Sequence, residues 1–423
     1  MTRVLVVGRG AREHAIAHKA LRSPRLKVFV APGNAAMRPP IQRVPIEEKD
    51  IAGLRQFIRT ERIDYVIVGP EAPIARGMYD DLHDLATVVA PPQRLSFLES
   101  SKARAKAFMK QHGIPTPEAV VFESAQLEAA LDYLRRCTYP VVVKASGLAQ
   151  GKGVLIAYTP EEALSFARAC LSGEKFGAAG QTILVEKFLE GEERSVFLLA
   201  DGKGYALLPT VRDYKRREEK DQGPNTGGMG SYAPAEDLAW LETIRHKVIE
   251  PTWAGIQALG RAYTGFLYIG LMKTAEGPYV LEYNIRLGDP EAQVLLPLLE
   301  NDLEEVLYYY KIQKLTELKI RLHANYAVGV VAATAGYPEK PTQGQLLPEP
   351  PAAEGGCLVE ADSYIYWAGV DQNAQGQWVT TGGRTYTAVG LGPDLEAARA
   401  RAYAILDKFP FEGRIYRKDI AQR

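Results

Sequence analysis

The first hundred residues alternate short apolar runs with helical patterns, and this alternation restricts the possible folds more than any other feature of the sequence. The apolar runs are Arg3–Val7, Lys27–Ala31, Tyr65–Val68 and Thr87–Ala90, and the helical segments between them are Glu13–Leu21 and Ile51–Glu61. Alternation of this kind predicts an open parallel sheet, because parallel strands need long crossover connections. Ligands bind such sheets at the carboxyl ends of the strands. Those ends are Gly8-Arg9-Gly10, Gly33-Asn34 and Gly69-Pro70-Glu71.

The length of the chain predicts more than one domain, since 423 residues are too many for a single hydrophobic core. A double proline at 91–92 and the polar stretch after it indicate the first boundary. We therefore expect an α/β protein with a parallel-sheet domain at 1–100, a two-lobed core at 101–325 and a small α+β domain at 326–423. Within the core, the segment at about 117–190 has its own strands and helix and predicts a mobile lid.

Composition excludes several classes of protein. Lys+Arg and Asp+Glu both number 51, so the formal net charge is zero, whereas nucleic-acid-binding proteins usually have a basic excess. No run of 18 apolar residues and no signal-peptide pattern is present, so we expect no membrane segment and a cytoplasmic location. The cysteines, Cys137, Cys170 and Cys357, are odd in number and far apart, which predicts reduced thiols.

The turn at Gly8-Arg9-Gly10 begins like a dinucleotide-binding fingerprint but departs from it. Glu13 stands at the third glycine position, where a side chain would hinder close packing of helix and strand. The second strand also ends without the acidic residue that binds a ribose, so we do not expect a nicotinamide site. The backbone N–H groups of such a turn can still bind a phosphate. A plain tight turn is the alternative.

A glycine-rich loop spans Gly147–Gly153. It is not a Walker A loop, because three residues rather than four separate its first two glycines, and Gly153 follows the lysine where serine or threonine is required. Its three glycines and Lys152 would still allow it to close over a polyphosphate, with Lys144 as a second cation. The alternative is a flexible surface hairpin.

The segment Asp221–Gly230 holds four glycines and a proline in ten residues, which excludes a helix or a regular strand. Asp213 and Lys215 lie shortly before it. Apolar, well-patterned segments flank the run, and this favours a structured loop. A disordered linker is the alternative.

The most informative stretch is Glu282–Glu291. On a strand, residues two apart share one face, so Glu282 and Asn284 point the same way, and Arg286 joins them if the strand continues. A carboxylate and an amide oxygen suit Mg²⁺, which takes few protein ligands beside phosphate oxygens and water. A nearby arginine suits a phosphate that is being transferred. The alternative is a salt-bridged strand edge.

The order of these motifs resembles that of the phosphoribosylamine–glycine ligase family of the ATP-grasp superfamily, and the resemblance runs nearly from end to end. The stretches that resemble the family are Val6–His14, Ala31–Asn34, Ile67–Pro73, Ser101–Ala103, Gly147–Val154, Gly223–Gly230, Tyr263–Tyr268, Glu282–Glu291, Gly382–Arg384 and Arg417–Ile420. The stretch Gly223–Gly230 is highly specific to this family, whereas other ATP-grasp ligases share the lysine–glycine loop and the acid–amide strand more loosely. The resemblance implies an ATP-grasp fold for the core.

The resemblance also implies roles for individual residues. ATP would be bound by Lys102, Lys144, Gly151, Lys152, Gly153, Glu186, Phe188, Leu189 and Glu193. Phosphoribosylamine and glycine would be bound by Gly10, Glu13, Asn34, Glu71, Asn225, Thr226, Gly227 and Gly228. Magnesium or manganese would be bound by Glu282 and Asn284, and catalysis would involve Arg286, Lys215 and Asp213.

The implied reaction joins glycine to 5-phosphoribosylamine at the expense of ATP, through a glycyl phosphate, as the second step of purine biosynthesis in a monomeric enzyme. Two alternatives stay open: a related purine-pathway ATP-grasp enzyme that uses bicarbonate or formate, and a nucleotide-binding regulator without activity. The sequence departs from the family pattern at Arg9, Ala11, Lys187 and Ile285, but none of these changes removes a ligand atom.

Overall fold

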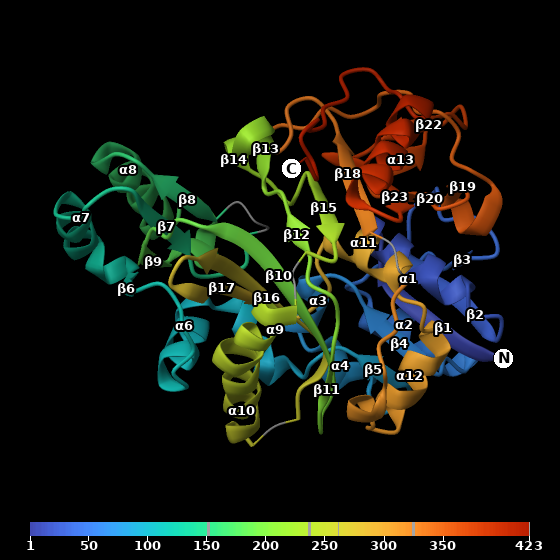
Figure 1. Ribbon diagram of the computed structural model, residues 1–423, viewed down its shortest axis with the longest axis horizontal. Helices are drawn as coiled ribbons and strands as arrows, with labels where there is room; N and C mark the ends of the chain where they lie inside the picture. The colour runs from blue at the N-terminus through green and yellow to red at the C-terminus, as the bar shows by residue number, and fades with distance from the viewer. Residues whose placement is uncertain (150–152, 236–237, 261, 324–325, 423) are drawn as a thin grey trace.

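The computed structural model describes residues 1–149, 153–235, 238–260, 262–323 and 326–422. Figure 1 shows an N-terminal sheet at the lower right and a C-terminal sheet at the upper right. The sheet at the left belongs to residues 119–187, a segment called the lid below, and a central sheet lies between these three. The mixed α/β architecture confirms the predicted fold class. Within these described ranges, no helix is both long enough and apolar enough to cross a membrane.

The N-terminal sheet is parallel throughout, as the alternation of strands and helices predicted. Its order is β3-β2-β1-β4-β5, with β1 at Thr2–Gly8, β2 at Leu26–Pro32, β3 at Gln42–Arg43, β4 at Tyr65–Val68 and β5 at Thr87–Val89. The helices of this region are α1 (Ala11–Leu21), α2 (Ile51–Glu61), α3 (Glu71–Ala75) and α4 (Met78–Leu82). Residues 4–7 of β1 are fully buried, as expected for a central parallel strand covered on both faces.

The lid has an antiparallel sheet and a hydrophobic core of its own. The sheet order is β6-β9-β7-β8, with β6 at Ala119–Glu123, β7 at Val141–Ala145, β8 at Val154–Ala157 and β9 at Thr182–Lys187. Helices α7 (Leu127–Arg135) and α8 (Pro160–Leu171) pack on it. Helix α8 begins where it does because the Thr159 hydroxyl accepts the Glu162 N–H and Pro160 occupies the first turn.

The central sheet has the order β11-β10-β16-β17, with β10 at Glu192–Asp201, β11 at Tyr205–Leu207, β16 at Thr264–Thr274 and β17 at Gly277–Asn284. Helices α9 (Leu238–Ile244) and α10 (Glu250–Ala258) belong to this region. Helices α5 (Phe97–Ser100) and α6 (Lys102–Gln111) connect it to the N-terminal sheet. The Ser101 hydroxyl caps α6 by accepting the Arg104 N–H, which places Lys102 at the start of the helix.

The C-terminal sheet takes two of its six strands from the middle of the chain. Its order is β12-β15-β18-β23-β20-β19, with β12 at Arg212–Asp213, β15 at Gly230–Ala233, β18 at Tyr326–Ala333, β19 at Leu358–Glu360, β20 at Ser363–Trp367 and β23 at Arg384–Gly392. Its helices are α11 (Glu291–Leu298) and α13 (Leu395–Lys408), and α12 (Leu303–Lys311) follows α11. The sheet therefore crosses the boundary expected at residue 325, and the domain limits stay a prediction.

Candidate active site

A cavity of about 710 Å³ lies between the lid, the central sheet and the C-terminal region. The predicted site residues that line it are Glu71, Lys102, Lys144, Gly153, Glu186, Phe188, Leu189, Glu193, Asp213, Lys215, Asn225, Thr226, Gly227, Glu282, Asn284 and Arg286. The predicted residues Gly10, Glu13, Asn34 and Gly228 are not among its lining residues. The predicted residues Gly151 and Lys152 lie outside the described ranges.

Strand β17 carries Glu282 and Asn284 to this cavity, and a β-bulge just before them interrupts its regular alternation. Gly270 of β16 pairs with Glu282, but the next residue, Leu271, pairs with Val280, so Leu281 is an extra residue in a β-bulge. Val280, on the far side of the bulge, is buried in the core, whereas Glu282 and Asn284 stay half-buried at the cavity wall.

The Glu282 carboxylate is ionised, because positive charge surrounds it. Burial acts to raise its pKa, but Lys215, Lys102 and Lys144 together hold that pKa below the ordinary value of a glutamate. The nearest of these cations, Lys215 Nζ, is 3.9 Å from Glu282 Oε1. Among the residues the structure describes, no group of three or more His, Cys, Asp or Glu side chains could hold a metal alone. The pair on β17 offers two oxygen donors, and a hard cation takes few protein ligands beside phosphate oxygens and water.

Glu186, a cavity residue whose contact with the nucleotide stays a prediction, is the centre of a buried ion-pair triad. Its carboxylate lies 2.8 Å from Lys106 Nζ and 2.7 Å from Lys144 Nζ. Lys144 Nζ also donates to the carbonyl of Leu281, the bulged residue of β17, at 3.2 Å. Burial acts to raise the pKa of Glu186, but the two lysines hold it below its ordinary value. The triad thus fixes Lys144 against strand β17, which we call the metal-strand candidate because it carries Glu282 and Asn284.

Lys102 lies at the junction between helix α6 and the glycine-rich loop. Its backbone N–H donates to the Ser146 carbonyl at 2.9 Å, and its Nζ donates to the Gly147 carbonyl at 3.2 Å. Burial lowers the pKa of this lysine, while Glu282 acts in the opposite direction. The ammonium group of Lys102 is therefore hydrogen-bonded to Gly147, the first residue of the loop that was predicted to cover a polyphosphate.

Two carboxylates from the N-terminal region hold Arg286. Arg286 Nη2 is 3.0 Å from Glu99 Oε1 and donates to Asn284 Oδ1 at 3.2 Å, and its Nε is 3.4 Å from Glu71 Oε2. The second oxygen of Glu99 accepts the Ile285 N–H at 2.8 Å. Glu99 thus orients the end of β17 and the guanidinium together, although it was not predicted as a site residue.

A cluster of charge surrounds Lys215 on the C-terminal side of the cavity. Lys215 Nζ is 2.8 Å from Glu193 Oε2 and 3.9 Å from Asp213 Oδ2. Glu193, predicted to contact the nucleotide, is therefore paired with a predicted catalytic lysine. Burial raises the pKa of Asp213, and the charge of Glu193 adds to this effect. Burial and the charge of Asp213 also raise the pKa of Glu291, a cavity residue that sequence analysis did not select, to about 8.

The side chain of Glu13 packs against the N-terminal turn at Gly8-Arg9-Gly10. The Glu13 carboxylate accepts the Gly10 N–H at 2.6 Å and the Arg12 Nε–H at 2.6 Å. A Cβ atom at Gly69 would lie 1.9 Å from Glu13 Oε1, so the side chain packs directly on the end of β4. The Gly10 N–H that was predicted to face a phosphate therefore already has an anionic partner.

Both the nitrogen and the oxygen of the Asn34 side-chain amide form hydrogen bonds within the protein. Its nitrogen donates to the carbonyls of Arg9 at 2.8 Å and Trp367 at 2.9 Å, and its oxygen accepts the Ala36 N–H at 3.0 Å. The residue joins the N-terminal turn to strand β20 of the C-terminal sheet. Its predicted contact with substrate stays a prediction.

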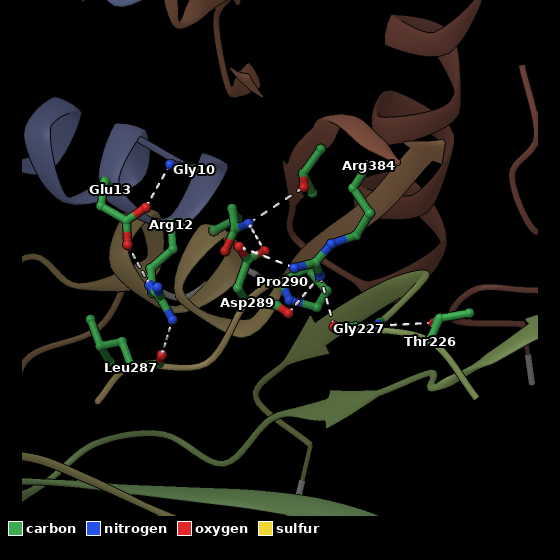
Figure 2. A network of polar contacts seen from close by, with 12 residues as sticks. Gly10, Arg12, Glu13, Thr226, Gly227, Leu287, Asp289, Pro290 and Arg384 are labelled. Atoms are coloured by element: carbon green, nitrogen blue, oxygen red, sulfur yellow. Dashed lines mark hydrogen bonds and ion pairs between the residues drawn. The ribbon is translucent and has the colours of Figure 1, made fainter. Parts of the chain in front are cut away.

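The glycine loop, defined here as residues 225–228, meets the C-terminal region at the cavity edge. Arg384 reaches the Gly227 carbonyl, as Figure 2 shows, and Asp289 lies beside it. Arg384 belongs to the Gly382–Arg384 motif, to which no role was given from sequence. The residues that sequence analysis missed are Arg12, Glu99, Lys106, Asp289, Glu291 and Arg384. For Arg12, Asp289, Glu291 and Arg384, a signal was present, since they lie in stretches that resemble the family.

Comparisons with known proteins show which family the chain resembles along its length. Family models of phosphoribosylglycinamide synthetase match the chain in three consecutive parts: the N domain at 2–99, the ATP-grasp (A) domain at 100–292 and the C domain at 327–423. The phosphoribosylamine–glycine ligase of Neisseria meningitidis serogroup B is 41% identical over 100% of this chain and 99% of its own. That of Escherichia coli O6:H1 is 42% identical, with 100% and 98% covered.

Solved structures are also similar to this chain, one at the level of the family and one at the level of the fold. The phosphoribosylamine–glycine ligase of Thermotoga maritima has a TM-score of 0.83 and 35% identity, covering 99% of this chain and 100% of its own. The biotin carboxylase of Campylobacter jejuni, with a TM-score of 0.71, 16% identity and 98% and 92% covered, shows a shared fold alone. The chain therefore belongs to the phosphoribosylamine–glycine ligase family, the ATP-grasp enzymes that form a C–N bond in the second step of purine biosynthesis.

Proposed function

We propose that this chain joins glycine to 5-phosphoribosylamine through a glycyl phosphate, and that Glu282 and Asn284 hold the metal ion that accompanies ATP. The supporting observation is the arrangement of charge at β17. An ionised carboxylate and an amide oxygen face one cavity, and the lysines that keep the carboxylate ionised come from three different segments of the chain.

The two oxygen donors fit a hard divalent cation. ATP-grasp enzymes use ATP with Mg²⁺ or Mn²⁺, and such ions take few protein ligands when phosphate oxygens supply the rest. The low pKa of Glu282 keeps its carboxylate charged at neutral pH. The amide oxygen of Asn284 is held by Arg286, which donates to it at 3.2 Å. When bound, the ion neutralises charge on the polyphosphate and polarises the phosphoryl group that is transferred.

The chemistry requires activation, because an amine cannot displace oxide from a free carboxylate. A glycine carboxylate oxygen attacks the γ-phosphorus of ATP, and ADP leaves with the electron pair of the broken P–O bond. The amine nitrogen of phosphoribosylamine then attacks the acyl carbon, loses a proton, and inorganic phosphate leaves. Lys102 and Lys144 orient the polyphosphate, and Arg286 stabilises the transferred phosphoryl group. The glycine loop excludes water from the acyl phosphate.

The decisive experiment measures ADP release with phosphoribosylamine present and with glycine first omitted and then restored. The proposal expects release only after glycine is added. The double variant Glu282→Ala/Asn284→Ala should abolish it, whereas Tyr279→Phe, on the same strand but outside the cavity lining, should not. An active double variant would contradict the metal assignment. Release with bicarbonate or formate, and none with glycine, would favour a related ATP-grasp reaction.

A further inference from the structure

Arg384, the first residue of β23, connects two segments that are far apart in the chain. Its Nη1 donates to the carbonyls of Gly227 and Asp289, both at 2.7 Å, and its Nη2 is 3.3 Å from Asp289 Oδ2 (Figure 2). One guanidinium group thus holds the glycine loop and the segment that follows the metal-strand candidate at a fixed separation. The planar, forked geometry of arginine suits this task, and a lysine cannot reproduce it.

A second side chain of the C-terminal region, Tyr337, also contacts the glycine loop. The Tyr337 hydroxyl accepts the Gly227 N–H at 2.9 Å. A Cβ atom at Gly383 would lie 2.2 Å from the Tyr337 ring, so the ring packs on the residue just before Arg384. A Cβ atom at Gly227 would lie 3.1 Å from both Arg384 Cζ and the Tyr337 oxygen. The absence of a side chain at Gly227 therefore allows this double contact.

The loop in turn rests on Lys215. The N–H and the hydroxyl of Thr226 both donate to the Lys215 carbonyl at 2.8 Å. The ammonium group of the same lysine is 3.9 Å from Glu282. A continuous path of contacts therefore runs from Arg384, through the glycine loop, to the lysine beside the proposed metal ligand.

The backbone attaches the loop to the C-terminal sheet as well. Strand β15 begins at Gly230, two residues after the loop, and pairs with β18 from Gly230↔Val330 to Ala233↔Ala327. A displacement of β18 or β23 would therefore move the loop. The lid lies on the opposite side of the cavity and has its own core.

We propose that Arg384 is a positioning residue for the ligase reaction, and that through it the C-terminal region fixes the glycine loop over Lys215. This inference rests on the proposed function, in which the loop shields the acyl phosphate from water. When Arg384 no longer holds the Gly227 carbonyl, the loop keeps its attachments at β15, Tyr337 and Lys215, but its tip moves more freely. Water then competes with the amine, so ADP release becomes uncoupled from product formation.

The test compares Arg384→Ala and Arg384→Lys with the full-length parent protein. As a control, Arg401→Ala removes another arginine of the C-terminal sheet region, which pairs with Asp362 at 3.3 Å and is not a cavity residue. For Arg384→Ala we expect the KM for glycine to rise about 10- to 100-fold, the range for removal of a hydrogen bond to a charged group. The ADP released per product formed should rise above one, and Arg384→Lys should recover part of the coupling. Affinity for ADP should stay within about twofold, because the lid side is unchanged.

A structural measurement separates this inference from the proposed function. Hydrogen exchange of the peptide amides at 226–228 should accelerate at least about tenfold in Arg384→Ala and stay unchanged in Arg401→Ala, whether or not the protein turns over. Exchange and coupling equal to the control would overturn the inference. If Arg384→Ala does not fold, Arg384→Lys decides, since lysine keeps the positive charge but not the forked geometry that holds Gly227 and Asp289 together. Normal exchange and normal coupling in that variant would also overturn it. Failure of the proposed function would appear differently, as no glycine-dependent ADP release by the parent protein.

Discussion

His14 makes the stability of this protein depend on pH. The ring is fully buried between α1 and the C-terminal region, where its Nδ1 accepts the Trp367 N–H at 3.1 Å. Its Nε2 therefore holds the proton and donates to the Gly355 carbonyl at 3.0 Å. Burial lowers the pKa of His14 from 6.5 to about 4. Between these values the unfolded chain binds a proton that the folded protein does not, so stability is complete above pH 6.5 and falls as the pH falls.

The magnitude follows from the two pKa values. The free energy of unfolding should fall by about 1.8 kcal/mol between pH 7 and pH 5 through His14, towards a limit of about 3.4 kcal/mol below pH 4. Urea unfolding, monitored by tryptophan fluorescence, should show this loss in the parent protein. His14→Gln keeps one donor and one acceptor but does not titrate, so its pH dependence should be smaller by that amount. His246→Gln, at an exposed histidine, is the control. Equal pH dependence in the parent protein and His14→Gln would refute the reasoning.

Three further predictions concern the cavity. Glu99→Gln keeps an acceptor for the Ile285 N–H but leaves Arg286 with a weaker partner, so kcat should fall about 10- to 100-fold with little change in the KM for ATP, as steady-state ADP release would show. Glu186→Gln removes the shared partner of two buried lysines, and urea unfolding should show a loss of about 3 kcal/mol, with weaker ADP binding by calorimetry. Chelation of divalent ions should abolish glycine-dependent ADP release, and added Mg²⁺ or Mn²⁺ should restore it; activity that persists would exclude a metal role for Glu282.

Local patterns predicted four strands and two helices of the N-terminal region, but not the short elements β3, α3 and α4. The segment Ile51–Glu61 and the strand Tyr65–Val68 have the predicted limits, and β1 extends one residue beyond the prediction at each end. These elements follow from apolar periodicity and from the turns that end them, both of which are short-range properties. The prediction that Glu282 and Asn284 share a face also succeeded, because the bulge at Leu281 precedes them rather than separating them.

The contacts between segments could not be predicted in this way. Glu99 holds Arg286 from 187 positions away in the sequence, and nothing near Glu99 indicates that pairing. Asn34 follows strand β2 as expected and Glu13 lies in the first turn of α1, but their hydrogen bonds to Trp367 and to the Gly10 N–H could not be predicted from their neighbours in the sequence. Local rules place a residue at a site, but the partners of its side chain depend on tertiary packing.

The partners of the cavity cations bear on the proposal that a metal ion accompanies ATP in a site so rich in lysine. Lys144 is paired with Glu186, Lys215 with Glu193, and Arg286 with carboxylates of the N-terminal region. Such pairs hold each cation in place before substrate arrives, but they also offset most of its charge. A polyphosphate that entered alone would meet cations that already pair with carboxylates, among them the lysine that lies beside Glu282. Under the proposed function, a divalent ion would add positive charge that these pairs do not supply, and Glu282 and Asn284 would be the protein ligands that hold it.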